Sequence, residues 1–156
     1  MEQESTINAT FFRFEDLRIY HKSMDYVDWV MNTTKQLTDE KIPVIVDKFN
    51  TSAQSIAFNI AEGSARNKSQ FVYYLKMAKS AVRECVVITT VLEKHGVISD
   101  TQVAESRNEL MEMTKMLGAL IGSLQKSPNF KRENKTNGRG TEEEVLEEDS
   151  TNFNRY

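Results

Sequence analysis

The chain has 156 residues, of which 39% are hydrophobic, and this is enough apolar surface for the core of one domain. It carries 20 Lys and Arg against 23 Asp and Glu, and a net charge of -3 is not typical of a dedicated nucleic-acid binder. A single cysteine, Cys85, excludes an internal disulfide framework and a multi-cysteine zinc site.

The N-terminal residues indicate where the protein works. They read MEQESTINATFF, which is acidic and polar where a signal peptide is basic and then apolar. No run approaches the ~18 apolar residues that a membrane span needs. The sequence therefore predicts a cytoplasmic protein, in which a lone thiol stays reduced.

The pattern divides the chain into an N-terminal arm (1–13), a helical body (14–125) and a C-terminal tail (126–156). The tail has a basic half followed by an acidic half and contains few large apolar side chains. Such a segment cannot bury enough surface to offset its ordering entropy, so we predict that it is disordered. It is either a solubilising tail or an arm that contacts a partner.

Apolar residues recur at helical spacing in four segments of the body. The first covers about residues 14–36, and the second starts at Pro43, a residue tolerated at the first helical position. Gly63 is expected to end the second helix as a left-handed cap. The inner face of the first helix is predicted to consist of Leu17, Tyr20, Met24, Val27 and Met31.

The third helix covers about residues 69–94, and Ser99 with Gln102 forms a capping-box pattern that opens the fourth. The fourth helix has an apolar stripe that faces the core. We assign Arg107 and Thr114 to the positions of this stripe that no apolar residue occupies. Four amphipathic helices joined by short loops predict an all-α protein, an up-down-up-down antiparallel four-helix bundle.

Catalytic and metal-binding patterns are missing from the sequence. The residues three before His21 and His95 are Arg18 and Leu92, so neither histidine belongs to the Glu-x-x-His pair of a di-iron bundle. No phosphate-binding glycine loop or hydrolase motif occurs, and Cys85 falls on the inner row of the third helix. We expect no enzyme activity, no metal and no cofactor.

A basic stripe is the strongest candidate for a binding site. From residue 63 to residue 83 there are five cations and no acid. The candidate nucleic-acid-binding residues are Arg66, Lys68, Lys76, Lys79 and Arg83. On a helix the last three fall within about 60° of one another, and such a stripe can neutralise a run of phosphates. The alternative is an ordinary solvated helix face.

A second apolar row on the first helix predicts an oligomer. It lies over about 100° from the centre of the expected inner face, and an exposed apolar patch usually marks an interface. Phe11, Phe12, Phe58 and Tyr74 are expected to join it. The candidate interface residues are Ile19, Tyr26, Trp29, Val30 and Tyr73.

Three strings of sequence carry a family resemblance. Phe14-Glu15-Asp16-Leu17-Arg18-Ile19-Tyr20 opens the first helix, Ser55-Ile56-Ala57-Phe58-Asn59-Ile60-Ala61-Glu62-Gly63 closes the second, and Asn67-Lys68-Ser69-Gln70-Phe71-Val72-Tyr73-Tyr74-Leu75-Lys76-Met77-Ala78 opens the third. The chain resembles, over about residues 14–125, the four-helix-bundle family encoded in intervening sequences of bacterial large-subunit ribosomal RNA genes. Members are often labelled ribosomal proteins, and the accessory variability determinant of diversity-generating retroelements is related.

The resemblance implies a ring-like homopentamer and, for the retroelement branch, binding of nucleic acid and of a reverse transcriptase. The family tends to carry arginines in the middle of the second helix, where this chain has Phe49-Asn50-Thr51-Ser52-Ala53. This difference leaves the basic stripe as the main candidate surface. We assign the family motif residues Asn59, Glu62 and Gly63 to fixing the turn between the second and third helices, with either Arg66 or a residue of the third helix as partner of Glu62.

Two functions follow from these patterns. The first is a non-enzymatic, oligomeric four-helix-bundle adaptor that binds RNA or DNA weakly and without sequence preference through the basic stripe. The alternative is a protein–protein assembly scaffold that binds no nucleic acid.

Overall fold

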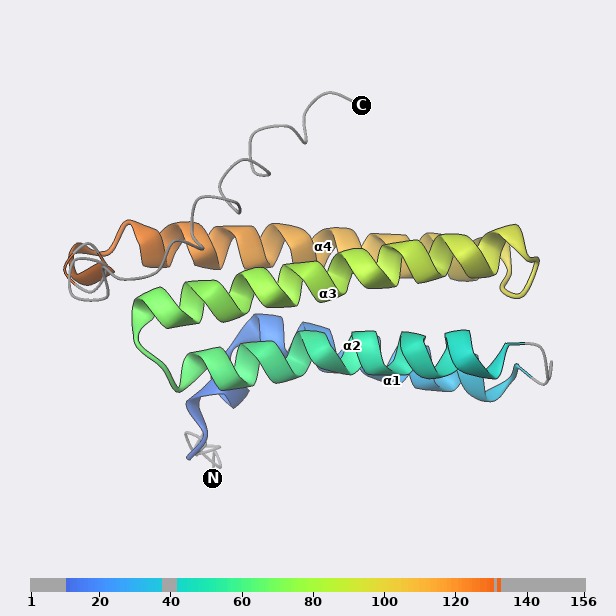
Figure 1. The fold of residues 1–156 in the computed structure, drawn as a ribbon, viewed down its shortest axis with the longest axis horizontal. Helices are drawn as coiled ribbons and strands as arrows, with labels where there is room; N and C mark the ends of the chain where they lie inside the picture. Colours follow the sequence, from blue (N-terminus) through green and yellow to red (C-terminus); the bar gives the residue numbers. More distant parts are fainter. Residues whose placement is uncertain (1–10, 38–41, 131, 133–156) are drawn as a thin grey trace, which may run out of the picture.

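The computed structural model describes residues 11–37, 42–130 and 132. Four long helices make up most of this part, and no strand occurs in it (Figure 1). The elements in chain order are the 3-10 helix η1 (Arg13–Asp16), α1 (Arg18–Lys35), α2 (Pro43–Ser64), α3 (Lys68–Lys94) and α4 (Asp100–Gln125).

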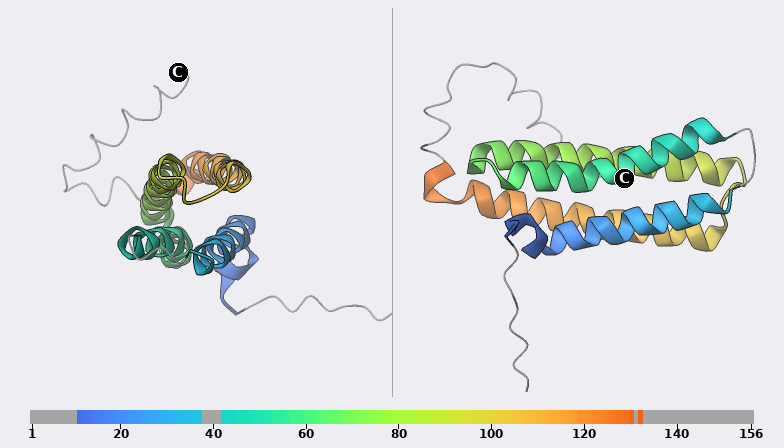
Figure 2. Two further views of the ribbon diagram at one scale, coloured as in Figure 1. Left: turned by 90° about the vertical axis from the view of Figure 1, so that its right-hand side faces the viewer. Right: turned by 90° about the horizontal axis from the view of Figure 1, so that it is seen from below.

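Each helix runs antiparallel to the next and packs against its neighbours in the chain, and α4 returns to lie beside α1 (Figure 2). The core between them is filled by side chains from all four helices. The largest fully buried side chains include Tyr26, Phe49, Ile56, Leu75, Leu92, Leu110 and Leu117. The predicted up-down-up-down four-helix bundle is confirmed.

The helix ends follow local sequence signals. Pro43 occupies the first turn of α2. The Ser99 hydroxyl accepts a hydrogen bond from the backbone nitrogen of Gln102 at 3.1 Å, while the Gln102 side chain accepts one from the backbone of Ser99 at 2.9 Å. Both halves of the predicted capping box are therefore present. Gly96, with φ of 64°, follows α3 in the left-handed conformation that ends helices.

The predicted inner face of α1 is partly wrong. Val27 is buried as predicted, and Leu17 and Tyr20 pack against the core. Met24 and Met31, assigned to the core, are 37% and 42% exposed. The row assigned to the outside holds the buried residues Ile19, Tyr26 and Val30. The helix is rotated this way because the Tyr26 ring packs against Phe49 and its hydroxyl reaches a buried partner on α4.

The predicted role of Gly63 as a left-handed cap is also wrong. Gly63 lies inside α2, and Gly96 is the only glycine with positive φ in the described part of the chain. Gly63 is buried where α2 meets α3, and a Cβ there would stand 2.6 Å from the Cβ of Tyr74. The glycine is needed for close helix packing rather than for a turn.

The seam positions of α4 differ from the prediction. Arg107 and Thr114 are exposed, and the buried positions next to them belong to Ser106 and Met113. Ser106 escaped the apolar pattern because a small hydroxyl residue gives no hydrophobic signal. It is buried here because its hydroxyl is hydrogen-bonded inside the bundle.

Two residues assigned to the tail from sequence, Ser127 and Phe130, contact the bundle. Lys68 donates a hydrogen bond to the Ser127 hydroxyl at 2.5 Å, and Phe130 packs on the core. The rest of the predicted tail, apart from Arg132, lies outside the described residues, as does the predicted arm up to residue 10. Across the described helices, none has the length and hydropathy to cross a membrane.

Candidate nucleic-acid interface

Four residues of the basic stripe lie on the side of α3 that faces α4, namely Lys68, Lys76, Lys79 and Arg83. Arg66 precedes α3 and pairs with Glu62 of α2 instead. Near one end of the seam between these helices, Lys68 bonds to Ser127, which follows α4. Near the other end, the Arg107 guanidinium of α4 donates to the Thr90 hydroxyl of α3 at 2.9 Å. Lys76, Lys79 and Arg83 lie between these contacts, within about 60° of Thr90 around the helix.

Three of the five stripe residues interact with neighbouring groups. Arg66 pairs with Glu62 and its guanidinium carbon lies 5.6 Å from the ring centre of Tyr74. The hydrogen bond to Glu62 raises the pKa of Arg66. Arg83 donates to the Ser80 hydroxyl at 3.1 Å, and Lys68 bonds to Ser127.

Lys76 and Lys79 differ from Arg66, which pairs with an acid, and from Lys68 and Arg83, which donate to serine hydroxyls. Lys76 and Lys79 are both partly exposed, and neither has an ion pair with any acid in the part of the chain that the structure describes. The acid on α3 that follows Arg83, Glu84, is turned toward α2, where it lies 3.4 Å from Lys48 and accepts from Ser52 at 2.8 Å. Two ammonium groups therefore remain available for an external anion.

The predicted oligomer interface is largely wrong in its residues. Ile19, Tyr26 and Val30 are buried in the core of one chain, because this row of α1 is the inner one. Trp29 is half-buried, stacks on Tyr26 with ring centres 5.8 Å apart and donates to Glu105. Tyr73, with 53% of its surface exposed, is the only member of the predicted set that presents a mostly free ring.

The exposed aromatic residues gather instead around the end of α2. Phe11 and Phe58 are 92% and 69% exposed, and Phe12 is also exposed. Together with Tyr74 they line an open hollow of about 780 Å³. The sequence pattern places these residues at the edge of an interface centred on the first helix. Their exposure makes them the main candidates for an oligomer interface.

The family motif residues are built into the α2–α3 junction. The Asn59 amide donates to the backbone oxygen of Ser55 at 2.8 Å, one helical turn earlier. Glu62 forms the predicted ion pair with Arg66, and Gly63 lets Tyr74 approach. The Glu62–Arg66 pair and the Gly63–Tyr74 contact lie at the α2–α3 junction, whereas the Asn59 bond stays within α2. The role of the motif in fixing the turn stays a prediction.

A buried hydroxyl network links three helices and was not predicted. The Tyr26 hydroxyl of α1 lies 2.8 Å from the Ser106 hydroxyl of α4, which lies 2.8 Å from the Thr89 hydroxyl of α3. Cys85, buried as predicted, lies on the same stretch of α3. Burial raises the pKa of the Cys85 thiol to about 12, and so argues against a nucleophile.

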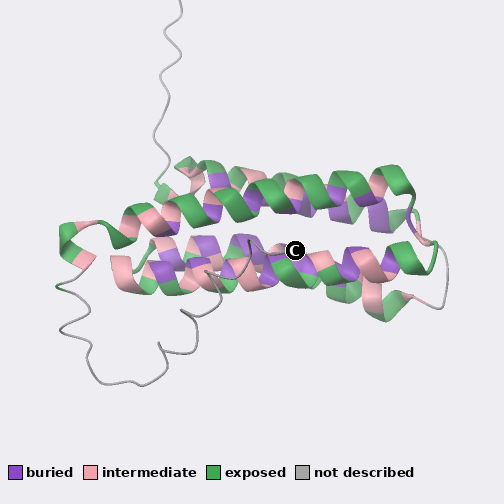
Figure 3. Cartoon of the chain, turned by 90° about the horizontal axis from the view of Figure 1, so that it is seen from above, coloured by how far each residue is buried: buried purple, intermediate pink, exposed green. Residues whose placement is uncertain are grey.

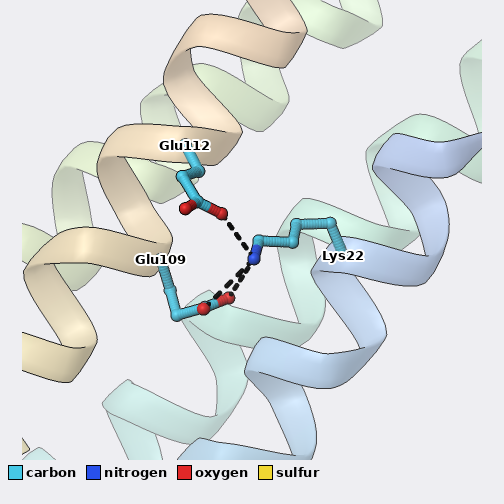
Figure 4. A network of polar contacts seen from close by, with 3 residues as sticks. All are labelled: Lys22, Glu109 and Glu112. Carbon is cyan, nitrogen blue, oxygen red and sulfur yellow. Dashed lines mark hydrogen bonds and ion pairs between the residues drawn. The ribbon is translucent and has the colours of Figure 1, made fainter.

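A polar cluster ties α1 to α4 (Figure 4). The Lys22 ammonium lies 3.0 Å from Glu109 and 2.6 Å from Glu112. Hydrogen bonds to these carboxylates raise the pKa of Lys22, and the bond from Lys22 lowers the pKa of Glu112. The sequence carries no local signal for this cluster, because Lys22 and Glu109 are 87 positions apart.

Metal-binding geometry is not seen in the described residues, where no three His, Cys, Asp or Glu side chains gather to hold an ion. What the surface offers is unpaired positive charge along α3 and exposed aromatic rings at the end of α2. Both features suit binding to another molecule.

The fold places the protein in the class of antiparallel bundles of four long helices with short connections. A family model for 23S rRNA-intervening sequence protein matches residues 15–119, and the chain belongs to this family. The resemblance found in the sequence is confirmed in this respect. None of the curated proteins matches the chain.

A solved structure supports the fold. The crystal structure of a protein with unknown function from the S23 ribosomal protein family of Bacteroides thetaiotaomicron is similar to this chain with a TM-score of 0.62 and 24% sequence identity. The match covers 66% of this chain and 97% of that chain. At this level of identity the similarity shows the shared bundle and assigns no ligand.

Proposed function

We propose that the protein is a non-enzymatic, oligomeric adaptor that binds nucleic acid through the basic stripe. The observation that supports this most is the pair Lys76 and Lys79, two accessible ammonium groups without an acidic partner among the described residues. Arg83 and Lys68 extend the positive surface in both directions along the same side of α3. Repetition of the stripe in an oligomer would multiply a weak contact.

The mechanism is phosphate neutralisation. Lysine ammonium groups are point charges that bind phosphate without reading base edges, so the stripe discriminates poorly between sequences. Neutralising about three phosphates predicts a plot of log affinity against log salt with a slope of about -3.

Fluorescence anisotropy of labelled structured RNA and duplex DNA across a salt series tests the proposal. Charge reversal of Lys76, Lys79 and Arg83 to glutamate is expected to abolish measurable binding. The matched control reverses two lysines and one arginine that are exposed on other parts of the chain, Lys35, Lys94 and Arg18, which gives the same net charge. An equal loss of affinity in both variants would show that only the overall charge of the protein matters, and would overturn the assignment to the stripe. Absence of binding by the wild-type protein at low salt would overturn the whole proposal.

The second candidate is a protein–protein assembly scaffold, favoured by the exposed rings of Phe11, Phe12 and Phe58. Large exposed aromatic groups are typical of interfaces. Light scattering of a Phe58→Glu variant measures the solution mass. Both the scaffold function and an oligomer formed through these rings predict that this mass falls. A Val87→Glu variant, which changes an exposed residue on the far half of α3, is the control.

A further inference from the structure

Two glycines on α4 lie across the seam from the free lysines. Gly118 and Gly122 fall within about 60° of Arg107 around α4, and Arg107 is the residue that contacts α3. The contacts at the two ends of the seam set the register of the antiparallel helices. Gly118 is therefore level with Lys79, and Gly122 with Lys76.

Neither glycine is required by packing inside the chain. A Cβ built at either position meets nothing within 4 Å, in contrast to Gly63, which is enclosed by α3. Both backbones are helical, since neither glycine has positive φ. Glycine is a poor helix former in a helix interior, so these two positions weaken α4 without improving the bundle.

The glycines leave the lysines uncovered. Figure 3, coloured by burial, views the molecule from above and shows α3 and α4 side by side, with exposed stretches along both helices. Along residues 114–125 of α4, Thr114 and Gln125 on this face are uncharged, Lys115 beside Gly122 is basic, and no acid occurs. The seam is therefore a strip with ammonium groups on one side and bare helix backbone on the other.

We infer that the sugar–phosphate backbone of a nucleic acid lies along this α3–α4 seam, against Gly118 and Gly122, with its phosphates held by Lys76 and Lys79. The inference rests on the proposed function and deepens it by naming the path of the ligand. A phosphate must come within hydrogen-bond distance of an ammonium group for a strong charge-assisted contact. The missing side chains on α4 permit a bulky sugar–phosphate chain to approach that closely.

The test fills the strip without changing charge. A Gly118→Met/Gly122→Met double variant places two uncharged side chains beside the lysines and offers no new hydrogen-bond donor. Affinity for structured RNA, measured by anisotropy at fixed low salt, is expected to fall by about tenfold, because the phosphates are held away from the ammonium groups. Ala119→Met, one residue further on an exposed face of α4, is the matched control and is expected to retain the wild-type affinity.

Thermal denaturation shows that the double variant is folded, and its melting temperature is expected to rise because methionine is a better helix former than glycine. Wild-type affinity in this variant would overturn the inference while leaving the proposed function intact. A changed solution mass with unchanged RNA affinity would also overturn it, since the strip would then pack a helix of a second copy. Failure of the wild-type protein to bind any nucleic acid would overturn both.

Discussion

Gly63 of α2 and Tyr74 of α3 approach so closely that the glycine hydrogen occupies space which no side-chain carbon could share. A Cβ at Gly63 would stand 2.6 Å from the Cβ of Tyr74 and 2.9 Å from a ring carbon of Phe71. The Tyr74 Cβ is attached directly to the helix backbone and cannot move away alone. The two helices would have to separate to admit even one methyl group.

We therefore predict that Gly63→Ala lowers the free energy of unfolding by about 1–3 kcal/mol, through overpacking of the α2–α3 contact. Urea denaturation followed by circular dichroism measures this change. Gly118→Ala is the control, because its Cβ meets nothing within 4 Å. That variant is expected to be more stable by up to about 1 kcal/mol, from helix propensity alone. A stabilised Gly63→Ala protein would contradict the packing role.

The hydroxyl network predicts a non-additive pair of mutations. Ser106→Ala removes the partner of the buried Tyr26 hydroxyl and is expected to cost about 1–3 kcal/mol, the range for a buried polar group left unsatisfied. Adding Tyr26→Phe removes the orphaned group, so the double variant should be less destabilised than the sum of the single variants. Denaturant titrations of all four proteins complete the cycle. Strict additivity would show that the two hydroxyls do not interact.

The same network explains which parts of the fold the sequence could predict. The capping box at Ser99 and the proline at the start of α2 are local signals, readable within one turn of helix. The rotation of α1 is not local, because apolar residues occur on both of its faces. The choice between them is made by the Tyr26–Ser106 contact, which joins positions 80 residues apart.

The candidate site also combines features that local sequence predicts with features that depend on contacts between distant residues. Helical spacing was sufficient to place Lys76, Lys79 and Arg83 together on α3. It could not show that this side faces α4, since that depends on contacts such as Arg107 with Thr90. The openness of the seam at Gly118 and Gly122 also depends on the distances between helices. The sequence alone does not distinguish a helical glycine that packs against another helix, such as Gly63, from one that faces open space, such as Gly118.

The Lys22 cluster predicts a dependence on salt and acid. Lys22→Met removes the ion pairs to Glu109 and Glu112 and is expected to cost about 0.5–1 kcal/mol at low salt, with a smaller loss in 1 M salt because these side chains are partly solvated. The lowered pKa of Glu112 means that its contribution is present above the ordinary carboxyl range and is lost as the pH falls. The stability difference from wild type should therefore narrow on acidification. Lys35→Met, an exposed lysine outside the cluster, is the control.

Cys85 predicts a loss of stability at alkaline pH. The thiol is fully buried, and burial raises its pKa to about 12, whereas an unfolded chain has a cysteine pKa of about 8.5. As the pH rises past about 8.5, the unfolded state loses its proton first and is favoured. The free energy of unfolding is thus expected to fall by about 1 kcal/mol per pH unit near pH 9, below the range in which tyrosines titrate.

Cys85→Ala should remove this slope, which urea titrations at several pH values would show. A thiol reagent at pH 8 gives an independent measurement: modification of the native protein is expected to proceed only at the rate of transient opening, and to become rapid in denaturant. Equal rates in both conditions would mean that the thiol is accessible in the native bundle. In that case the burial of Cys85 between the helices, and the alkaline slope derived from it, would both be contradicted.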